Sequence, residues 1–274
     1  MSSLETRRWD MRKNVVDMIM AGRGGHIGGD MSVLDILAGL YLEEMNVDPA
    51  DMENPDRDRL VLSKGHSVEA LYAVLAEKGF FPIEEAISTF SKFGSKFIGH
   101  PTNKVAGIEM NSGSLGHGLS VCVGMALAGR MDRRSFRVYT VMGDGELAEG
   151  SVWEGAMAGA HFKLGNLCAV VDRNRLQISG STEDVMRQDV QEERWASFGW
   201  NVISVADGNS ISALRQAFAQ ARECTDAPTV LIANTVKGYG ASVMENKAGW
   251  HHHLPTQEEY EEIIAEFEKR KAAE

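Results

Sequence analysis

Five short, mostly apolar runs constrain the fold of this chain more than any other feature. Such runs, bounded by turns, are typical of strands buried on both faces of a mainly parallel sheet. Helical segments lie between them, which predicts an α/β, doubly wound fold with helices on both faces. The runs occupy residues 60–62, 138–142, 167–171, 202–205 and 230–233.

The intervening helices follow from apolar residues at helical spacing. Ser32 is a plausible N-cap for the second helix, and a glycine-dense turn precedes it at residues 22–29. No repeat or linker interrupts the pattern, so we expect residues 1–274 to form a single domain with a helical N-terminal approach. The expected helices span 4–21, 32–45, 66–78, 83–91, 115–130, 146–163, 209–223 and 256–272.

Composition excludes several classes of function. The formal net charge of −11 opposes non-specific binding to nucleic acid or to anionic membranes. No apolar run approaches the roughly 20 residues of a membrane-spanning helix, and the N-terminus lacks the apolar stretch of a signal peptide. Cys122, Cys168 and Cys224 lie far apart, without metal-ligand spacing. We therefore expect a cytoplasmic protein that binds any phosphorylated ligand through local groups.

The strongest chemical signal follows two neighbouring predicted strands. Gly143-Asp144-Gly145 comes after the run at 138–142, and Asn174 comes shortly after the run at 167–171. The residues between Gly145 and Asn174, 146 through 173, equal one helix plus one strand, so the two loops emerge side by side. An Asp carboxylate, an Asn amide oxygen and a backbone carbonyl would leave room for two diphosphate oxygens and a water around Mg²⁺. The glycines permit close approach of an anion to free N–H groups.

Each of these features alone has a simpler explanation. Gly-Asp-Gly is common in turns, and Asn readily adopts left-handed turn conformations. The pair at one-crossover spacing, with each member following a buried strand, favours a metal and diphosphate site.

The whole chain resembles the N-terminal half of the transketolase family. Gly143-Asp144-Gly145 through Asn174 is similar to the thiamine diphosphate signature, although Arg173 replaces the first Asn of the usual pair. Four further motifs match in the family's order: 24–29 (GGHIGG), 57–66 (RDRLVLSKGH), 99–101 (GHP) and 112–118 (SGSLGHG). The resemblance implies the thiamine diphosphate-binding fold, specifically its diphosphate domain.

The resemblance assigns residues to the cofactor and its metal. Asp144, Asn174 and the carbonyl of Leu176 would ligate Mg²⁺ or Ca²⁺, and Gly145 with the N–H groups that follow would bind diphosphate with help from His66. Ser114 stands beside the cofactor, where proline is frequent in the family. The cofactor contacts implied in this way are His66, Gly113, Ser114, Leu115, Gly143, Gly145, Glu146, Asp172, Asn174, Ile178 and His251.

The catalytic residues implied by the resemblance are His26, His66, His100 and Glu149. His26 and His100 would bind the hydroxyls of a ketose donor, and Glu149 would join two active sites of the assembly. Imidazoles suit such proton transfers. Any one of these histidines alone is more simply a loop or core residue. For 251–253 (HHH), contact of His251 with the diphosphate and a solvated loop are both open.

The chain lacks a second α/β set, which in this family binds the aminopyrimidine and supplies a glutamate. The closing amphipathic helix and polar terminus favour a split transketolase over a fragment of a longer chain. We expect an N-terminal subunit that acts with a separate C-terminal subunit in a heterotetramer of two copies each. It would transfer a two-carbon ketol unit between sugar phosphates, as in the pentose phosphate pathway. Alternatives are ketol transfer on an unusual sugar phosphate or sulfosugar, a deoxyxylulose phosphate synthase-like half, and a non-catalytic cofactor-binding subunit.

Overall fold

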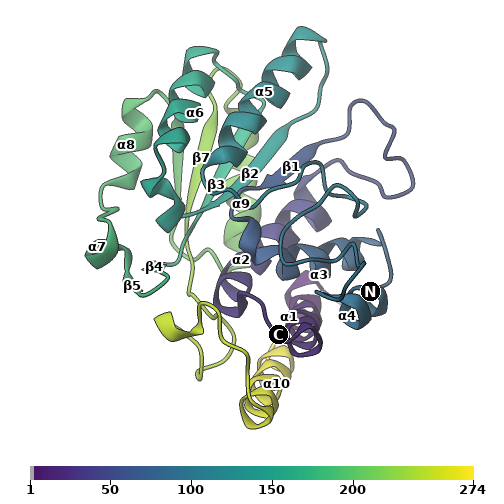
Figure 1. Cartoon of the computed structure of the whole chain (residues 1–274). Coiled ribbons are helices and arrows are strands. Elements are labelled where there is room, and N and C mark those ends of the chain that lie inside the picture. The colour runs from purple at the N-terminus through teal and green to yellow at the C-terminus, as the bar shows by residue number, and fades with distance from the viewer. Residues whose placement is uncertain (1–2) are drawn as a thin grey trace.

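The computed structural model describes residues 3–274 and has a five-stranded parallel sheet at its centre (Figure 1). The strand order is β1-β2-β3-β7-β6. All five predicted apolar runs are strands, correct to within two residues at either end. The strands are β1 (Arg59–Leu62), β2 (Val138–Gly143), β3 (Leu167–Arg173), β6 (Asn201–Val205) and β7 (Thr229–Asn234).

Helices cover both faces of the sheet, as the sequence predicts (Figure 1). On one face lie α5 (His117–Met131), α6 (Gly150–His161) and α8 (Gln191–Ser197). On the other, α2 (Ile27–Gly39) and α9 (Ile211–Glu223) contact the strands. Val61 belongs to one apolar core, and its neighbours Leu60 and Leu62 belong to the other. Residues of one strand are therefore buried on both faces, which explains why the runs are continuously apolar.

The remaining elements pack around this centre or connect it. Behind α2, α1 packs against α3 and α10. A short hairpin, β4 with β5, follows β3. These elements are α1 (Leu4–Gly22), α3 (Val68–Lys78), α4 (Ile83–Thr89), β4 (Leu176–Gln177), β5 (Gly180–Ser181), α7 (Thr182–Val185) and α10 (Gln257–Lys271), the π-helical turn η1 (Leu40–Glu44), and the 3₁₀ turns η2 (Gly65–Ser67), η3 (Gly145–Ala148) and η4 (Ala248–Trp250).

The second helix differs from the prediction. It begins at Ile27, five residues before the expected N-cap Ser32. Ser32 lies inside the helix, where its hydroxyl donates to Asp172 Oδ2 at 2.6 Å and its oxygen lies 3.0 Å from the Gly29 carbonyl oxygen. Gly28 lies within this helix rather than in a turn. A glycine is needed there because a Cβ would lie 2.7 Å from the Trp250 carbonyl oxygen. This glycine permits close packing rather than a reversal of the chain.

The chain crosses the sheet in one direction from β1 to β6 and in the opposite direction from β6 to β7. β1, β2 and β3 are adjacent in order, whereas β6 occupies the far edge and β7 returns to pair with β3. Right-handed crossovers in opposite directions place α6 and α9 on opposite faces. Such a reversal opens a crevice at the carboxyl ends of the strands, where ligands bind in open α/β sheets. No helix within residues 3–274 is both long and apolar enough to span a membrane.

Candidate active site

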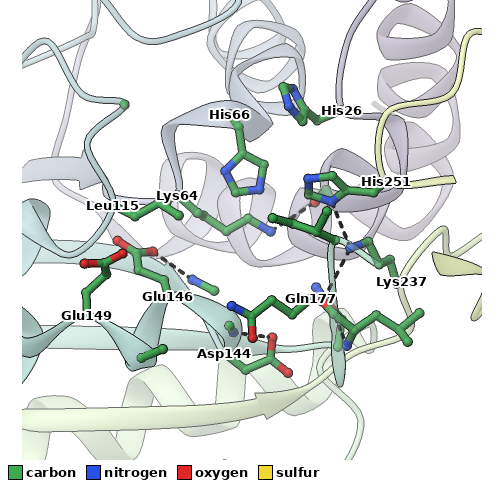
Figure 2. Close-up of a pocket in the computed structure, with 18 of the residues that line it drawn as sticks. His26, Lys64, His66, Leu115, Asp144, Glu146, Glu149, Gln177, Lys237 and His251 are labelled. Carbon is green, nitrogen blue, oxygen red and sulfur yellow. Dashed lines mark hydrogen bonds between the residues drawn. The ribbon is translucent and has the colours of Figure 1, made fainter. Parts of the chain in front are cut away.

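A cavity of about 300 Å³ lies at the carboxyl edge of the sheet. Its walls come from the loops that follow β1, β2, β3 and β7, and from the turn before α2. Figure 2 shows His26, His66 and His251 together on one side, with Glu146 and Glu149 on the opposite side. The sequence motifs, which are far apart along the chain, therefore converge on one place.

The three predicted metal ligands line this cavity. The Asp144 carboxylate is 2% exposed, and its Oδ2 accepts from the Arg175 N–H at 2.6 Å. Asn174 Oδ1 accepts from the Leu176 N–H at 3.1 Å, which fixes the turn that carries the Leu176 carbonyl. One carboxylate, one amide and one carbonyl form an all-oxygen donor set, which suits Mg²⁺ or Ca²⁺. No group of three or more His, Cys, Asp or Glu side chains within residues 3–274 could hold a metal ion.

The turn at Asp144 differs in detail from the prediction. Gly143-Asp144-Gly145 leads into the 3₁₀ turn η3, and α6 begins at Gly150 rather than at 146. Asp144 Oδ1 caps this turn by accepting from the Gly145 N–H at 2.9 Å. Burial, together with the nearby Asp172, raises the pKa of Asp144 to about 6. An ion that neutralised this buried charge would be favoured here.

Four predicted histidines line the cavity, grouped around His26. The ring centroid of His26 lies 5.1 Å from that of His66, 6.5 Å from that of His100 and 5.3 Å from that of His251. Burial is the main cause that lowers the pKa of His26 to about 4, of His66 to about 2 and of His251 to about 3. These rings are therefore neutral at physiological pH, and each offers one donor and one acceptor.

Gly113 permits His100 to lie at the cavity. It has φ +146°, and a Cβ there would come within 2.9 Å of the His100 ring. Leu115, two residues later, also lines the cavity. The glycine is thus required both by its backbone conformation and by the histidine beside it.

The two glutamates on the opposite wall have different surroundings. Glu146 is buried, and its carboxylate accepts from the Ser63 hydroxyl and from the N–H groups of Gly116 and Gly143, at 2.7 and 3.1 Å for the two N–H groups. It therefore ties three loops together. Glu149, in contrast, is exposed at the rim, where a second polypeptide could reach it.

Two lysines to which the sequence analysis gave no role also line the cavity. The Lys64 ammonium is buried and contacts Asp172 Oδ2 at 2.6 Å. Lys237 Nζ donates to the Leu176 carbonyl at 3.4 Å and lies 3.0 Å from His251 Nδ1. Burial, with repulsion from Lys64, lowers the pKa of Lys237 to about 8. Both lysines follow a strand, and in open α/β sheets ligands bind at the carboxyl ends of the strands. This rule could have identified both lysines as candidate site residues.

The β4–β5 hairpin contributes the rim beyond Leu176. Ile178, at its turn, is 65% exposed and has φ +48°, a rare conformation for a β-branched residue. Gln177 lies against Gly145, where a Cβ would be 2.9 Å from its Cγ. The Gln177 side-chain oxygen is buried without a hydrogen-bond partner in the described part of the chain. Strain and an unpartnered polar atom at one rim are typical of a binding site.

Two predicted cofactor contacts do not line the cavity. Ser114 is exposed outside it. Asp172 is fully buried behind Lys64, and it accepts hydrogen bonds from Ser32 and Thr235. It supports the cavity from below because it occupies the last fully buried position of a central strand.

The three consecutive histidines, residues 251–253, occupy different positions. His251 lines the cavity. The ring of His252 is exposed, 4.7 Å from that of His26. His253 points elsewhere and lies 2.8 Å from Glu259 at the start of α10.

Comparison with known proteins identifies the fold and its family. Residues 8–268 match the family described as transketolase, thiamine diphosphate binding domain. The chain belongs to this family. It is 47% identical over 268 residues to one of the subunits of the apulose-4-phosphate transketolase of Phocaeicola vulgatus, covering 98% of this chain and 95% of that one. It is 43% identical over 249 residues to 6-deoxy-6-sulfo-D-fructose transketolase subunit SqwG of a Clostridium species, covering 90% of each chain.

Full-length transketolases align with this transketolase-family chain over less than half of their own length. Human transketolase is 40% identical over 258 residues, which are 94% of this chain and 41% of the human one. The crystal structure of Pichia stipitis transketolase in complex with sedoheptulose 7-phosphate superposes with a TM-score of 0.88 at 29% identity. That match covers 99% of this chain and 44% of the Pichia chain. The two relatives of similar length described above are named as subunits, and the longer relatives contain additional sequence.

Proposed function

We propose that this chain is the diphosphate- and metal-binding subunit of a transketolase. In this proposal, a two-carbon ketol unit passes from a ketose phosphate to an aldose phosphate, with thiamine diphosphate and Mg²⁺ as cofactors. The observation that carries the proposal is a single cavity that joins an all-oxygen ligand set to a group of neutral histidines. We also retain the predictions of one domain over residues 1–274 and of a cytoplasmic location.

Asp144, Asn174 and the Leu176 carbonyl would hold Mg²⁺, and Ca²⁺ is an alternative. Gly145 and the N–H groups after it would face the diphosphate, with His66 and His251 beside them. When bound, the thiazolium ring supplies the electron sink for the donor carbanion. Lys237 donates to the Leu176 carbonyl, so its ammonium lies beside the predicted ligand set and would place positive charge near the diphosphate.

The neutral rings of His26 and His100 would bind the hydroxyl groups of the ketose donor. A neutral imidazole can accept the proton of a hydroxyl and return it to an aldehyde oxygen. The rings of His26, His66 and His100 line the same cavity as the ligand set, with the His26 ring within 6.5 Å of each of the other two. Leu115 and Ile178 would supply the apolar contacts that orient the cofactor between them.

We propose that a separate C-terminal subunit completes the site. Relatives of this length are named as subunits, and Glu149 is exposed at the cavity rim. The partner would bind the aminopyrimidine and supply its glutamate. A heterotetramer of two copies of each chain would bring two Glu149 carboxylates into one assembly.

The sugar substrates form a second proposal. The relatives named for apulose 4-phosphate and for 6-deoxy-6-sulfo-D-fructose favour an uncommon ketose over the sugars of the pentose phosphate pathway. The histidines would bind hydroxyl groups of the donor, and the groups that distinguish one donor from another would be contacted mainly by the partner. A non-catalytic role would not explain why four histidines that are neutral at physiological pH line one cavity.

The test combines this chain with a C-terminal transketolase subunit, a chain that matches the part of full-length transketolases that this chain does not cover. Ketol transfer is measured with xylulose 5-phosphate, apulose 4-phosphate and 6-deoxy-6-sulfo-D-fructose as donors and ribose 5-phosphate or glyceraldehyde 3-phosphate as acceptors. We expect turnover only with both chains, thiamine diphosphate and Mg²⁺ present. Turnover by this chain alone would refute the need for a partner, and the donor with the highest kcat/KM decides between the two substrate proposals.

A further inference from the structure

An acidic residue follows each of two histidines at the cavity, in the first turn of the next helix. Asp30 comes four residues after His26, near the start of α2, and Glu69 comes three residues after His66, near the start of α3. Both acids are fully buried, and neither lines the cavity. Two buried acids therefore stand behind two histidines whose ring centroids are 5.1 Å apart.

These two carboxyl groups interact with each other and lack the partners that buried oxygens normally have. Asp30 Oδ1 accepts from the Ala70 N–H at 3.0 Å. Asp30 Oδ2 and both Glu69 oxygens are buried without a hydrogen bond of good geometry from the described residues, although the backbone N–H groups of His26 and of Glu69 itself approach the Glu69 carboxyl. The hydroxyl oxygen of Ser67 is buried in the same state. Four unpartnered polar atoms thus belong to side chains at the starts of α2 and α3.

One proton shared between the acids explains this arrangement. Burial disfavours ionisation, and two adjacent carboxylates repel each other, so the two acids cannot be charged at the same time. A single proton gives a short, charge-assisted hydrogen bond and leaves one negative charge. That charge lies in the first turns of α2 and α3, where helix dipoles stabilise an anion. Lys64 also acts on the pair, but its ammonium already contacts Asp172 at 2.6 Å.

We propose that Asp30 and Glu69 share one proton and that this carboxyl pair positions the His26 and His66 turns for the ketose donor. Both acids are positioning residues, since neither touches the cavity. Glu69 fills the space beneath the first of these turns, because a Cβ on Gly25 would lie 2.4 Å from Glu69 Oε1. The hydrogen bond between the two carboxyl groups would therefore join the start of α2 to the start of α3, directly after the turns that carry His26 and His66.

Alkaline pH is the condition that should break the pair. Burial raises the pKa of Asp30 to about 7 and the pKa of Glu69 well above its ordinary value. The other groups that act on the pair are Lys64, the Tyr72 hydroxyl and the backbone of His26, and the α1 side chain that lies nearest to Gly25 is the apolar Ile19. Loss of the last proton would leave two adjacent charges, which should separate the two turns and weaken donor binding.

The first test uses the full chain without a partner or cofactor. Glu69→Gln replaces the shared proton with an amide N–H of nearly the same size, and Glu84→Gln at an exposed position is the control. Each proton that only the folded chain retains makes the unfolding equilibrium constant rise roughly tenfold per pH unit. We therefore expect the unfolding equilibrium constant of Glu69→Gln to rise less steeply with pH than that of the wild type, by roughly one factor of ten per pH unit. Urea denaturation between about pH 5 and pH 9 measures this difference. The same pH dependence in Glu69→Gln and the wild type would overturn the shared proton.

The second test rests on the proposed function and uses the assembled enzyme. The KM for the donor should rise with alkaline pH in the wild type and stay constant in Glu69→Gln, while the Kd for thiamine diphosphate follows the same profile in both. Identical KM profiles would overturn the positioning role. An assembled wild type without ketol transfer would refute the proposed function instead, and the unfolding measurements would still decide whether the proton is shared.

Discussion

Replacement of Lys64 by methionine should reveal how much the buried ion pair beneath the cavity stabilises the chain. Lys64 and Asp172 are 2% and 0% exposed and lie 2.6 Å apart. Methionine has nearly the same length and no charge, so Lys64→Met leaves Asp172 as a buried carboxylate without its cation. The hydroxyls of Ser32 and Thr235 would still donate to it.

The size of the effect follows from this geometry. Removal of one member of a buried ion pair costs about 3–5 kcal/mol. The two remaining hydroxyl donors place Lys64→Met at the lower end, about 3 kcal/mol. For a chain of this size, about 1 kcal/mol corresponds to roughly 2–4 °C in Tm, so the Tm should fall by about 6–12 °C.

The assay is calorimetric or fluorescence-detected thermal unfolding of the full chain at neutral pH. Lys96→Met is the matched control, because the Lys96–Glu85 pair is 38% and 44% exposed with a separation of 3.0 Å and should contribute at most about 1 kcal/mol. Asp172→Asn introduced together with Lys64→Met should restore part of the loss by removing the unpaired charge. If Lys64→Met melts no lower than Lys96→Met, the pair does not stabilise the fold as reasoned.

Three further predictions concern the cavity itself. Asp144→Ala should abolish Mg²⁺-dependent binding of thiamine diphosphate to the assembled enzyme, and unchanged affinity in titration calorimetry would show that the ligand assignment is wrong. His100→Asn should lower kcat by roughly 10²-fold or more while the cofactor Kd stays within about twofold; equal losses would make it a cofactor ligand. Because the folded pKa of His66 lies below its unfolded value, its contribution to stability is present above about pH 6.5 and is lost on acidification. His66→Asn should therefore flatten the loss of stability below pH 6.5, and exposed His161→Asn should leave it unchanged.

The sheet could be predicted almost completely from the sequence, because continuous apolar runs have few other uses in a chain of this composition. The helices were predicted less well where glycine was involved. The sequence pattern places Gly28 in a turn, whereas the structure places it inside α2, packed against the Trp250 carbonyl. That contact joins positions more than two hundred residues apart, so no local pattern encodes it. The short α7, α8 and the β4–β5 hairpin also lack a periodic signal.

The candidate site was predictable where a motif directly follows a strand. Asp144, Asn174 and His66 all lie where the strand ends indicated. Asp172 lies behind the cavity rather than in its wall, because the buried part of the strand includes it and its carboxylate contacts Lys64. Lys237 was overlooked because lysine after a strand is usually a solvated residue, and its burial depends on the distant loop that carries His251. Three-dimensional neighbours, rather than residue type, decide such cases.

The anchoring of the cavity walls at strand ends has a consequence for assembly. Loops that follow β1, β2, β3 and β7 begin at atoms already fixed by parallel hydrogen-bonded ladders. Glu146 further joins three of the neighbouring backbone segments. A second chain that docks here meets a surface whose conformational freedom was lost during folding rather than during association. Complex formation should then carry a small ordering entropy on this side, and slow structural adjustments should arise mainly in the partner.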